Sequence, residues 1–246
     1  MLGLDRPFFT RYFEWGLAAL QGDLGVSAVT HQSVLADLMF RLPITASLLI
    51  LAMFFAAVMG IVFGTAAAVN KGGRIDWIMN GIANLLMAIP PFVAAVLLVL
   101  FLAIMVPMFP ATGYANLTDG FGQWLLYMTL PAISLALIPG ALLTRQVRGA
   151  LVDALEEDYV RTARAKGLRS WTVVGKHAAK NAAVPVITVI GLVLTSMLGG
   201  AVVVERIFAI PGIGSLSVES VLNGDLITLQ GLVLFVAVPT ATSTRD

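Results

Sequence analysis

The side chains that most often carry chemistry are scarce in this 246-residue chain. It has no cysteine, which removes disulfides, thiolate metal ligands and cysteine nucleophiles. Its two histidines, His31 and His177, lie far apart in the sequence and indicate no zinc site. The pattern G-x-x-x-x-G-K-[ST], whose backbone amides cradle phosphates, does not occur. We therefore expect no enzymatic activity, no metal site and no cofactor on this chain.

The composition points to a membrane protein. Hydrophobic residues make up 59% of the chain and charged residues only 12%, about half the charged fraction of an ordinary soluble domain. Too few charges remain to cover the surface of a water-soluble globule of this size. A net charge of +1 also excludes the strongly basic face that nucleic-acid binding needs.

Four apolar segments are long enough to cross a hydrocarbon core, which takes about 20 helical residues, and a fifth is marginal. None carries Asp, Glu, Lys or Arg in its interior. We expect an all-α fold, a polytopic transmembrane helix bundle of about five spans. The spans lie near 44–69, 78–106, 124–143, 184–204 and 226–238. Around them lie an external segment, 1–43, and a polar C-terminal tail, 239–246.

Lys and Arg alternate between the loops, as the positive-inside rule requires. Loop 144–183 holds eight of the fifteen and loop 70–77 holds two, whereas 107–123 has none and 205–225 has one. The first two loops are therefore expected in the cytoplasm, with the N-terminal segment outside and the C-terminus cytoplasmic. An external N-terminal segment without a signal peptide predicts a further helix ahead of it. The short fifth span predicts an incomplete C-terminus.

No acidic or histidine side chain lies inside a predicted span. Proton- and sodium-driven carriers generally use such groups within the bilayer. If the protein transports against a gradient, its energy is expected to enter from a separate subunit at the cytoplasmic face.

Prolines and small residues mark several spans. Pro90 and Pro91 fall midway along the second span, and Pro131 and Pro139 interrupt the third. A proline inside a helix removes a hydrogen bond and kinks it, so these positions, with Asn84, are candidates for a translocation pathway. Kinks also occur in static bundles, and Asn84 is a candidate for an interhelical hydrogen bond first and for the pathway lining second.

Three stripes of small residues, spaced every four positions, predict close packing of helix backbones. Such stripes suit either the lining of a moving bundle or static packing. They are Ala56, Gly60, Gly64 and Ala68; Ala132, Ala136, Gly140 and Thr144; and Gly191, Thr195 and Gly199.

Loop 144–183 has a residue order that predicts two short helices. Acidic residues at 153–158 precede basic residues at 161–166, the order that a helix dipole favours. Gly167 suits the end of the first helix, and Ser170 is placed to N-cap the second. One face of the first helix is formed by Leu155, Tyr159 and Ala163.

The amino-acid sequence of this loop resembles the EAA loop of ABC importer permeases, in the form found in the dipeptide/oligopeptide/nickel permease family. The similar residues are 158–168, DYVRTARAKGL, followed by His177, Asn181 and Pro185. In the general pattern Glu-Ala-Ala followed by Gly, the matching positions are Arg161, Thr162, Ala163 and Gly167, of which only the last two fit. Shorter similar stretches follow the family's order from about residue 2 to about residue 238.

The resemblance implies the fold of a type I ABC importer permease in the bacterial cytoplasmic membrane. It implies a second homologous permease subunit, two ATP-binding subunits that would hold ATP and Mg²⁺, and an extracytoplasmic substrate-binding protein. The loop would couple to the ATPases, with the face of Leu155, Tyr159 and Ala163 seated in an ATPase groove. Its coupling residues would be Asp158, Tyr159, Arg161, Thr162, Ala163, Lys166, Gly167, His177 and Asn181.

The expected substrates are di- or oligopeptides. Nickel and glutathione permeases share the same pattern and remain alternatives. A truncated, non-transporting permease fragment is a second alternative, and a channel is a third, although a channel needs no EAA-like loop.

Overall fold

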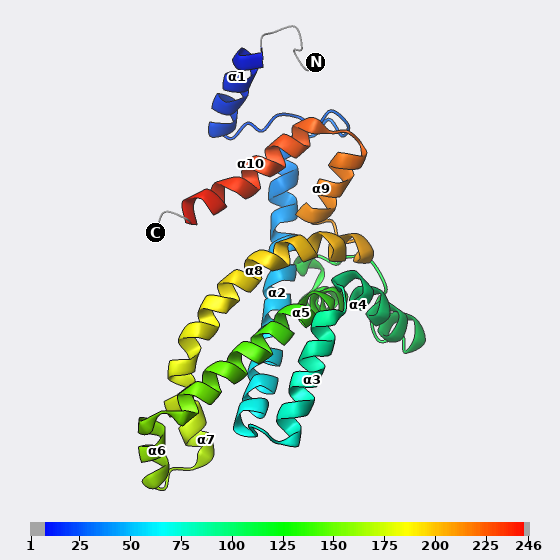
Figure 1. Ribbon diagram of the computed structural model, residues 1–246. Coiled ribbons are helices and arrows are strands. Elements are labelled where there is room, and N and C mark those ends of the chain that lie inside the picture. Colours follow the sequence, from blue (N-terminus) through cyan, green and yellow to red (C-terminus); the bar gives the residue numbers. More distant parts are fainter. Residues whose placement is uncertain (1–7, 244–246) are drawn as a thin grey trace. The chain divides into compact units, whose positions relative to one another are not determined.

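Helices account for nearly all of residues 8–243, the part of the chain that the computed structural model describes (Figure 1). Within this range the β-structure is confined to an isolated antiparallel bridge between Val26 and Ser33. The expected all-α fold is therefore confirmed. The chain divides into two compact units, of which unit 1 comprises Met1–Ala46 and Pro211–Asp246, and unit 2 comprises Ser47–Ile210.

Unit 2 contains the long helices and the loop expected in the cytoplasm. Its elements are the later part of α2 (Val34–Val69), α3 (Arg74–Ala88), α4 (Pro91–Leu98), η1 (Val99–Met105), η2 (Leu117–Asp119), α5 (Phe121–Glu156), α6 (Asp158–Ala165), α7 (Ser170–Thr172), η3 (Val173–Ala178) and α8 (Ala179–Phe208). Unit 1 contains α1 (Phe8–Leu20), the start of α2, α9 (Ile213–Leu222) and α10 (Leu226–Ser243).

Three helical stretches are long and apolar enough to cross a membrane: α2, α5 and Val173–Phe208. Arg74–Ala88 and Pro91–Met105 meet the same criterion only as one broken span, bent by 102°. In α10 the described side chains, Leu226–Phe235, form a shorter apolar helix. The five expected segments are thus all helical, but one of them is sharply broken and one is short.

Several helices extend beyond the expected spans. Helix α2 begins at Val34, so the last part of the expected external segment 1–43 is helical, and residues 1–7 lie outside the described part. Helix α5 continues to Glu156, well past the expected end at 143. The expectation followed the thickness of the hydrocarbon core, whereas a helix ends where its backbone turns. Helix α9 lies in a loop for which no helix was predicted.

The prolines have unequal effects on their helices. The helix is interrupted at Pro90, which lies directly before α4. Pro91 is the first residue of α4, a position at which its missing N–H costs no helical hydrogen bond. The kink expected in the second span is confirmed. The interruption expected in the third span is wrong, because α5 runs unbroken through Pro131 and Pro139. Both prolines are buried, and the helix continues past them despite the lost hydrogen bonds.

The first two small-residue stripes form the contact between α2 and α5. A Cβ built on Gly60 would lie 2.5 Å from the Cβ of Leu143, and one on Gly64 would lie 2.7 Å from the carbonyl oxygen of Thr144. A Cβ on the facing Gly140 would lie closer still to the Met59 side chain. These two stripes are therefore packing surfaces. The third stripe is exposed in this chain, with nothing within 4 Å of a Cβ on Gly191 or Gly199.

We expect Gly60→Ala to destabilise the protein by about 1–3 kcal/mol, the usual cost of an overpacked site. The added methyl would meet the side chain and backbone of Leu143. Gly149→Ala on α5 is the matched control, because nothing lies within 4 Å of its Cβ. Thermal unfolding of the purified variants measures both, and equal melting temperatures would show that the two helices do not pack so closely.

In unit 1, a buried carboxylate joins two segments that lie far apart in the sequence. The Ser27 hydroxyl donates to Asp225 Oδ2 over 2.5 Å, and the Thr228 hydroxyl donates to the same oxygen over 2.7 Å. Burial raises the pKa of Asp225, but these hydrogen bonds outweigh it and hold that pKa below its ordinary value. Asp225 therefore stays ionised at the start of α10, where a negative charge suits the helix dipole.

Candidate functional site

The loop between α5 and α8 forms two short helices around a left-handed glycine. Helix α6 ends at Ala165, and Gly167 follows with φ of +78°. The Leu168 amide donates to the Ala163 carbonyl and the Gly167 amide to the Arg164 carbonyl, which is the hydrogen-bond pattern of a Schellman turn. The expected helix end at Gly167 is confirmed. The second helix begins at Ser170 itself, one residue earlier than an N-cap at that position implies.

A small core of its own holds the loop together. Val160 and Ala163 of α6 are buried against Val173 of η3, and Leu155 packs on them from the end of α5. The inward face of α6 is therefore formed by Val160 and Ala163. Ala163, expected on a face that seats in a partner, is only 6% exposed and cannot lie on such a surface.

The exposed face of α6 carries most of the other predicted coupling residues. Asp158 pairs with Arg161 over 3.3 Å, and Thr162 donates to the backbone carbonyl of Asp158. Lys166 is exposed at the end of the helix, beside Gly167. These residues lie together on one solvent-facing surface.

One hydrogen bond joins two predicted residues from opposite ends of the loop. Asn181 Nδ2 donates to Tyr159 Oη over 2.9 Å, which ties α8 to α6. His177 lies one turn earlier than Asn181, half-buried in η3. The candidates Pro90, Pro91, Pro131 and Asn84 lie on other elements and do not join this site.

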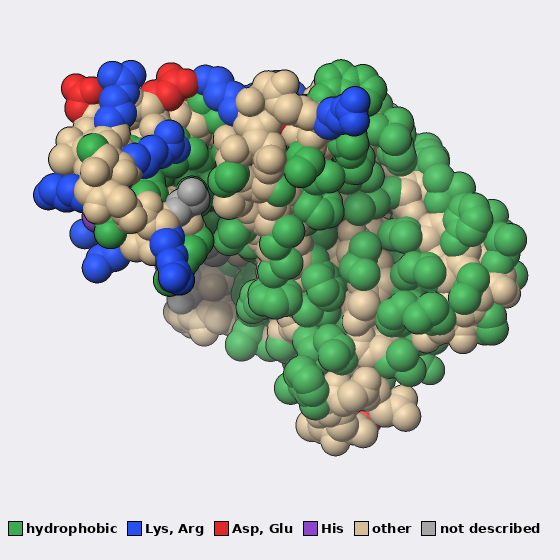
Figure 2. Space-filling model, turned by 90° about the horizontal axis from the view of Figure 1, so that it is seen from below, with side chains coloured by type: hydrophobic (Ala, Val, Ile, Leu, Met, Phe, Trp, Pro, Cys, Tyr) green, Lys and Arg blue, Asp and Glu red, His purple; other side chains and the backbone are tan. Residues whose placement is uncertain are grey.

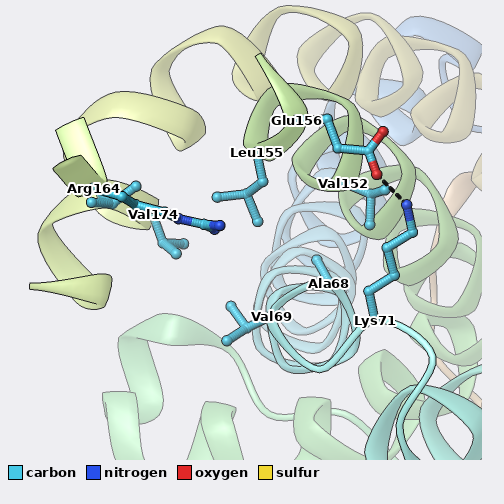
Figure 3. Close-up of a pocket in the computed structure, with 9 residues that line it drawn as sticks. Ala68, Val69, Lys71, Val152, Leu155, Glu156, Arg164 and Val174 are labelled. Atoms are coloured by element: carbon cyan, nitrogen blue, oxygen red, sulfur yellow. Dashed lines mark hydrogen bonds and ion pairs between the residues drawn. The ribbon is translucent and has the colours of Figure 1, made fainter. Parts of the chain in front are cut away.

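A cavity of about 350 Å³ separates the loop from the ends of α2 and α5 (Figure 3). Arg164 and Val174 border it on the loop side, and Val69 and Leu155 extend toward it from the long helices. Lys71 and Glu156 pair across its far edge. The loop thus rests on the bundle without filling the space beneath it.

Two ion pairs anchor the α2–α3 turn and the start of α3 to α5. Lys71 contacts Glu156 at the exposed edge of the cavity. Deeper in, Arg148 forms a two-pronged pair with Asp76, with Nε–Oδ1 at 2.5 Å and Nη2–Oδ2 at 2.7 Å. Asp76 is only 5% exposed and also accepts hydrogen bonds from Gly72 and Asn80. The α5 segment that carries the loop is thereby held at two points.

Positive charge gathers over the loop. Figure 2 shows Lys and Arg side chains clustered at one end of the face, over α6 and α7, while hydrophobic side chains cover much of the rest. This distribution agrees with a loop that lies in water beside an apolar bundle.

The sequence analysis missed the residues that hold the loop in place. Asp76 and Arg148 are 72 positions apart and carried no signal beyond their charge. Arg164 had no predicted role of its own within the sequence DYVRTARAKGL, and its place beside the cavity depends on the fold. The one hint in the sequence was an Asp next to an apolar segment, since a carboxylate that becomes buried there needs a partner.

A family model described as "Binding-protein-dependent transport system inner membrane component" matches residues 60–244 of this chain. The matched range includes the broken span, α5, the loop and α8. The chain belongs to this family. It is accordingly a multi-pass inner membrane component of an ABC transporter. The ABC importer permease fold that the loop sequence predicted is confirmed.

Relatives and solved structures agree with the family. A probable peptide ABC transporter permease of Sinorhizobium fredii is 36% identical over 236 residues, covering 96% of this chain and 75% of the relative. An oligopeptide transport system permease of Bacillus subtilis is 36% identical over 239 residues, covering 96% and 76%. The structure of a MetNI methionine ABC transporter aligns with a TM-score of 0.68 at 16% identity, covering 83% of this chain and 90% of that one.

Proposed function

We propose that this chain is the permease subunit of an ABC importer that passes di- or oligopeptides across the cytoplasmic membrane. Relatives named as peptide permeases, 35–37% identical over at least 95% of the chain, support the substrate class. The partners would be a second homologous permease, two ATP-binding subunits and an extracytoplasmic binding protein. ATP with Mg²⁺ would bind to the ATPase subunits.

The observation that carries the proposal is the construction of the loop. Helix α6 and η3 share a core of Val160, Ala163 and Val173, so the loop can move as one piece. Its outer surface presents Asp158, Arg161 and Thr162 to a partner. The cavity beneath it leaves room for displacement, and α5 continues without a break from the loop into the bundle. Force applied to α6 would therefore reach the transmembrane helices.

Uptake by the reconstituted transporter tests the proposal. The chain would be assembled with its partner subunits in vesicles, and ATP-dependent uptake of trialanine, glutathione and Ni²⁺ compared. We expect uptake of trialanine alone, dependent on the binding protein. Uptake of glutathione or Ni²⁺ instead would show that the protein is a permease for that substrate. The absence of any ATP-dependent uptake would favour the non-transporting alternative.

The proposed orientation places the α2–α3 turn in the cytoplasm and the loop that contains η2 outside. A cysteine-free chain allows a clean test with single cysteines. Lys71→Cys and Leu117→Cys are both at exposed positions. In intact cells a membrane-impermeant maleimide should label Leu117→Cys and leave Lys71→Cys unlabelled until the membrane is opened. Labelling in the reverse order would invert the proposed topology.

A further inference from the structure

A second cavity, of about 620 Å³, lies between α5 and α8. Leu142, Arg145 and Gln146 border it from α5, and Leu192, Val193 and Ser196 border it from α8. The two helices are antiparallel, since Gly200 lies beside Leu135 whereas Ala182 packs in one cluster with Leu151. Arg145 therefore lies just past the predicted third span, and Ser196 lies well inside the predicted fourth.

The polar lining of this groove does not suit lipid tails. Arginine and glutamine in membrane helices usually face a protein partner or a water-filled space, because hydrocarbon cannot hydrogen-bond them. The Ser196 hydroxyl donates to the Val193 carbonyl of its own helix over 2.7 Å. Arg145 is exposed, and its Nη1 lies 3.8 Å from the sulfur of Met87. Among residues 8–243 no carboxylate pairs with it, whereas the neighbouring Arg148 is fully engaged by Asp76.

We propose that this groove binds the transported peptide and that Arg145 receives its C-terminal carboxylate. The proposal rests on the proposed function as a peptide permease. A guanidinium binds a carboxylate through two parallel, charge-assisted hydrogen bonds. Every unmodified peptide has that carboxylate, so one arginine serves substrates of different sequence. A volume of about 620 Å³ is within the range of about 300–1,000 Å³ typical of small-ligand sites.

The rest of the groove matches the other parts of a short peptide. The Gln146 amide can donate to a peptide carbonyl and accept from a peptide N–H. Leu142, Leu192 and Val193 offer an apolar wall that accepts side chains without selecting among them. The Ser196 hydroxyl lies farther along the groove, toward the interior of the span. A peptide would thus lie along the groove with its carboxylate at the Arg145 end.

Protection of a single cysteine tests occupancy directly. Ser196→Cys would be introduced into the cysteine-free chain and the full transporter assembled in nanodiscs. Modification of this chain by N-ethylmaleimide would be followed by mass, with trialanine or its C-terminal amide added. We expect trialanine to slow modification and the amide to do so only at about 10- to 100-fold higher concentration, the loss for one charged hydrogen-bonded contact. Ile187→Cys, exposed on α8 outside the groove, should show no protection.

Variants of Arg145 complete the test. In the Ser196→Cys background, Arg145→Gln should remove the preference for trialanine over its amide, and Arg145→Lys should keep part of it, because the charge remains without the two-pronged geometry. Equal protection by both peptides in the unsubstituted Arg145 protein would overturn the role of Arg145. No protection by either would overturn the groove as a binding site.

ATP-dependent uptake of trialanine by the same Ser196→Cys transporter separates the two proposals. Uptake without protection leaves the peptide permease standing and removes the groove. Absence of uptake in the transporter without any substitution would remove the proposed function itself. If Arg145→Gln changes neither protection nor preference but lowers the retention of anionic phospholipid, Arg145 contacts a lipid headgroup and the proposal is wrong.

Discussion

Replacing Gly167 with valine should abolish most transport while leaving the protein inserted in the membrane. Gly167 has φ of +78°, in the left-handed region, where a residue with a Cβ loses about 1–2 kcal/mol. That strain shifts the equilibrium between the native turn and its alternatives by about 5- to 30-fold against the native turn. Nothing lies within 4 Å of a Cβ at Gly167, so the effect acts on the backbone and not through a clash.

Two further variants isolate that cause. Gly167→Asn should retain more uptake than Gly167→Val, because asparagine tolerates the left-handed conformation. Gly175→Val makes the same substitution in the same loop, at a glycine without positive φ and with nothing within 4 Å of its Cβ. We expect it to keep near-normal uptake. Uptake would be measured in vesicles, with membrane abundance of the chain as the check on insertion.

A normal rate with Gly167→Val would mean that the loop is only a tether between α5 and α8. Loss of uptake in both valine variants would instead indicate that any bulk in this loop disturbs the ATPase contact. Loss confined to Gly167→Val, with the ATPase subunits released from the complex, would identify the Schellman turn as the element that presents α6 to its partner.

The sequence could predict the local structure of this loop because its signals act over short distances. Acidic residues early in α6, basic residues late in it and Gly167 at its end depend on a single helix and its turn. The inward face was harder to assign. Leu155, Tyr159 and Ala163 are regularly spaced, but the helix is interrupted at Glu157, between α5 and α6. The regular spacing therefore does not place the three side chains on one face. Val160 is therefore buried, and Tyr159 hydrogen-bonds to Asn181 instead.

The spans were predictable from hydropathy. For the bend between α3 and α4, the sequence predicted the position but not the angle. Pro90 indicated a kink, whereas its size, 102°, depends on how α4 packs after the break. Pro131 and Pro139 gave the same signal and produce no break, and α2 and α8 likewise run through the exposed Pro43 and Pro185. The small-residue stripes behaved alike: two of them meet across α2 and α5, and the third is exposed. The spacing in the sequence shows that a helix face carries small side chains, but it does not show which element packs on that face.

The largest loss of stability is expected from Arg148→Leu. This change leaves the Asp76 carboxylate, 5% exposed, without its cation, and breaking such a buried pair typically costs about 3–5 kcal/mol. Asp76→Leu should cost less, because the Arg148 side chain is 28% exposed and can reach water. The free energy of unfolding of the purified protein, measured for both variants, would rank the two losses.

The double variant Arg148→Leu/Asp76→Leu shows whether the pair acts as a unit. Two leucines can pack where two charges met, so we expect the double variant to be more stable than Arg148→Leu alone. Strictly additive losses would mean that each side chain acts through other contacts. Because Arg148 lies about one turn before Leu151 and Val152, the pair also fixes the α5 segment beneath the loop. The double variant should therefore recover stability but transport more slowly, since only the exposed Lys71–Glu156 pair would still tie that segment to the α2–α3 turn.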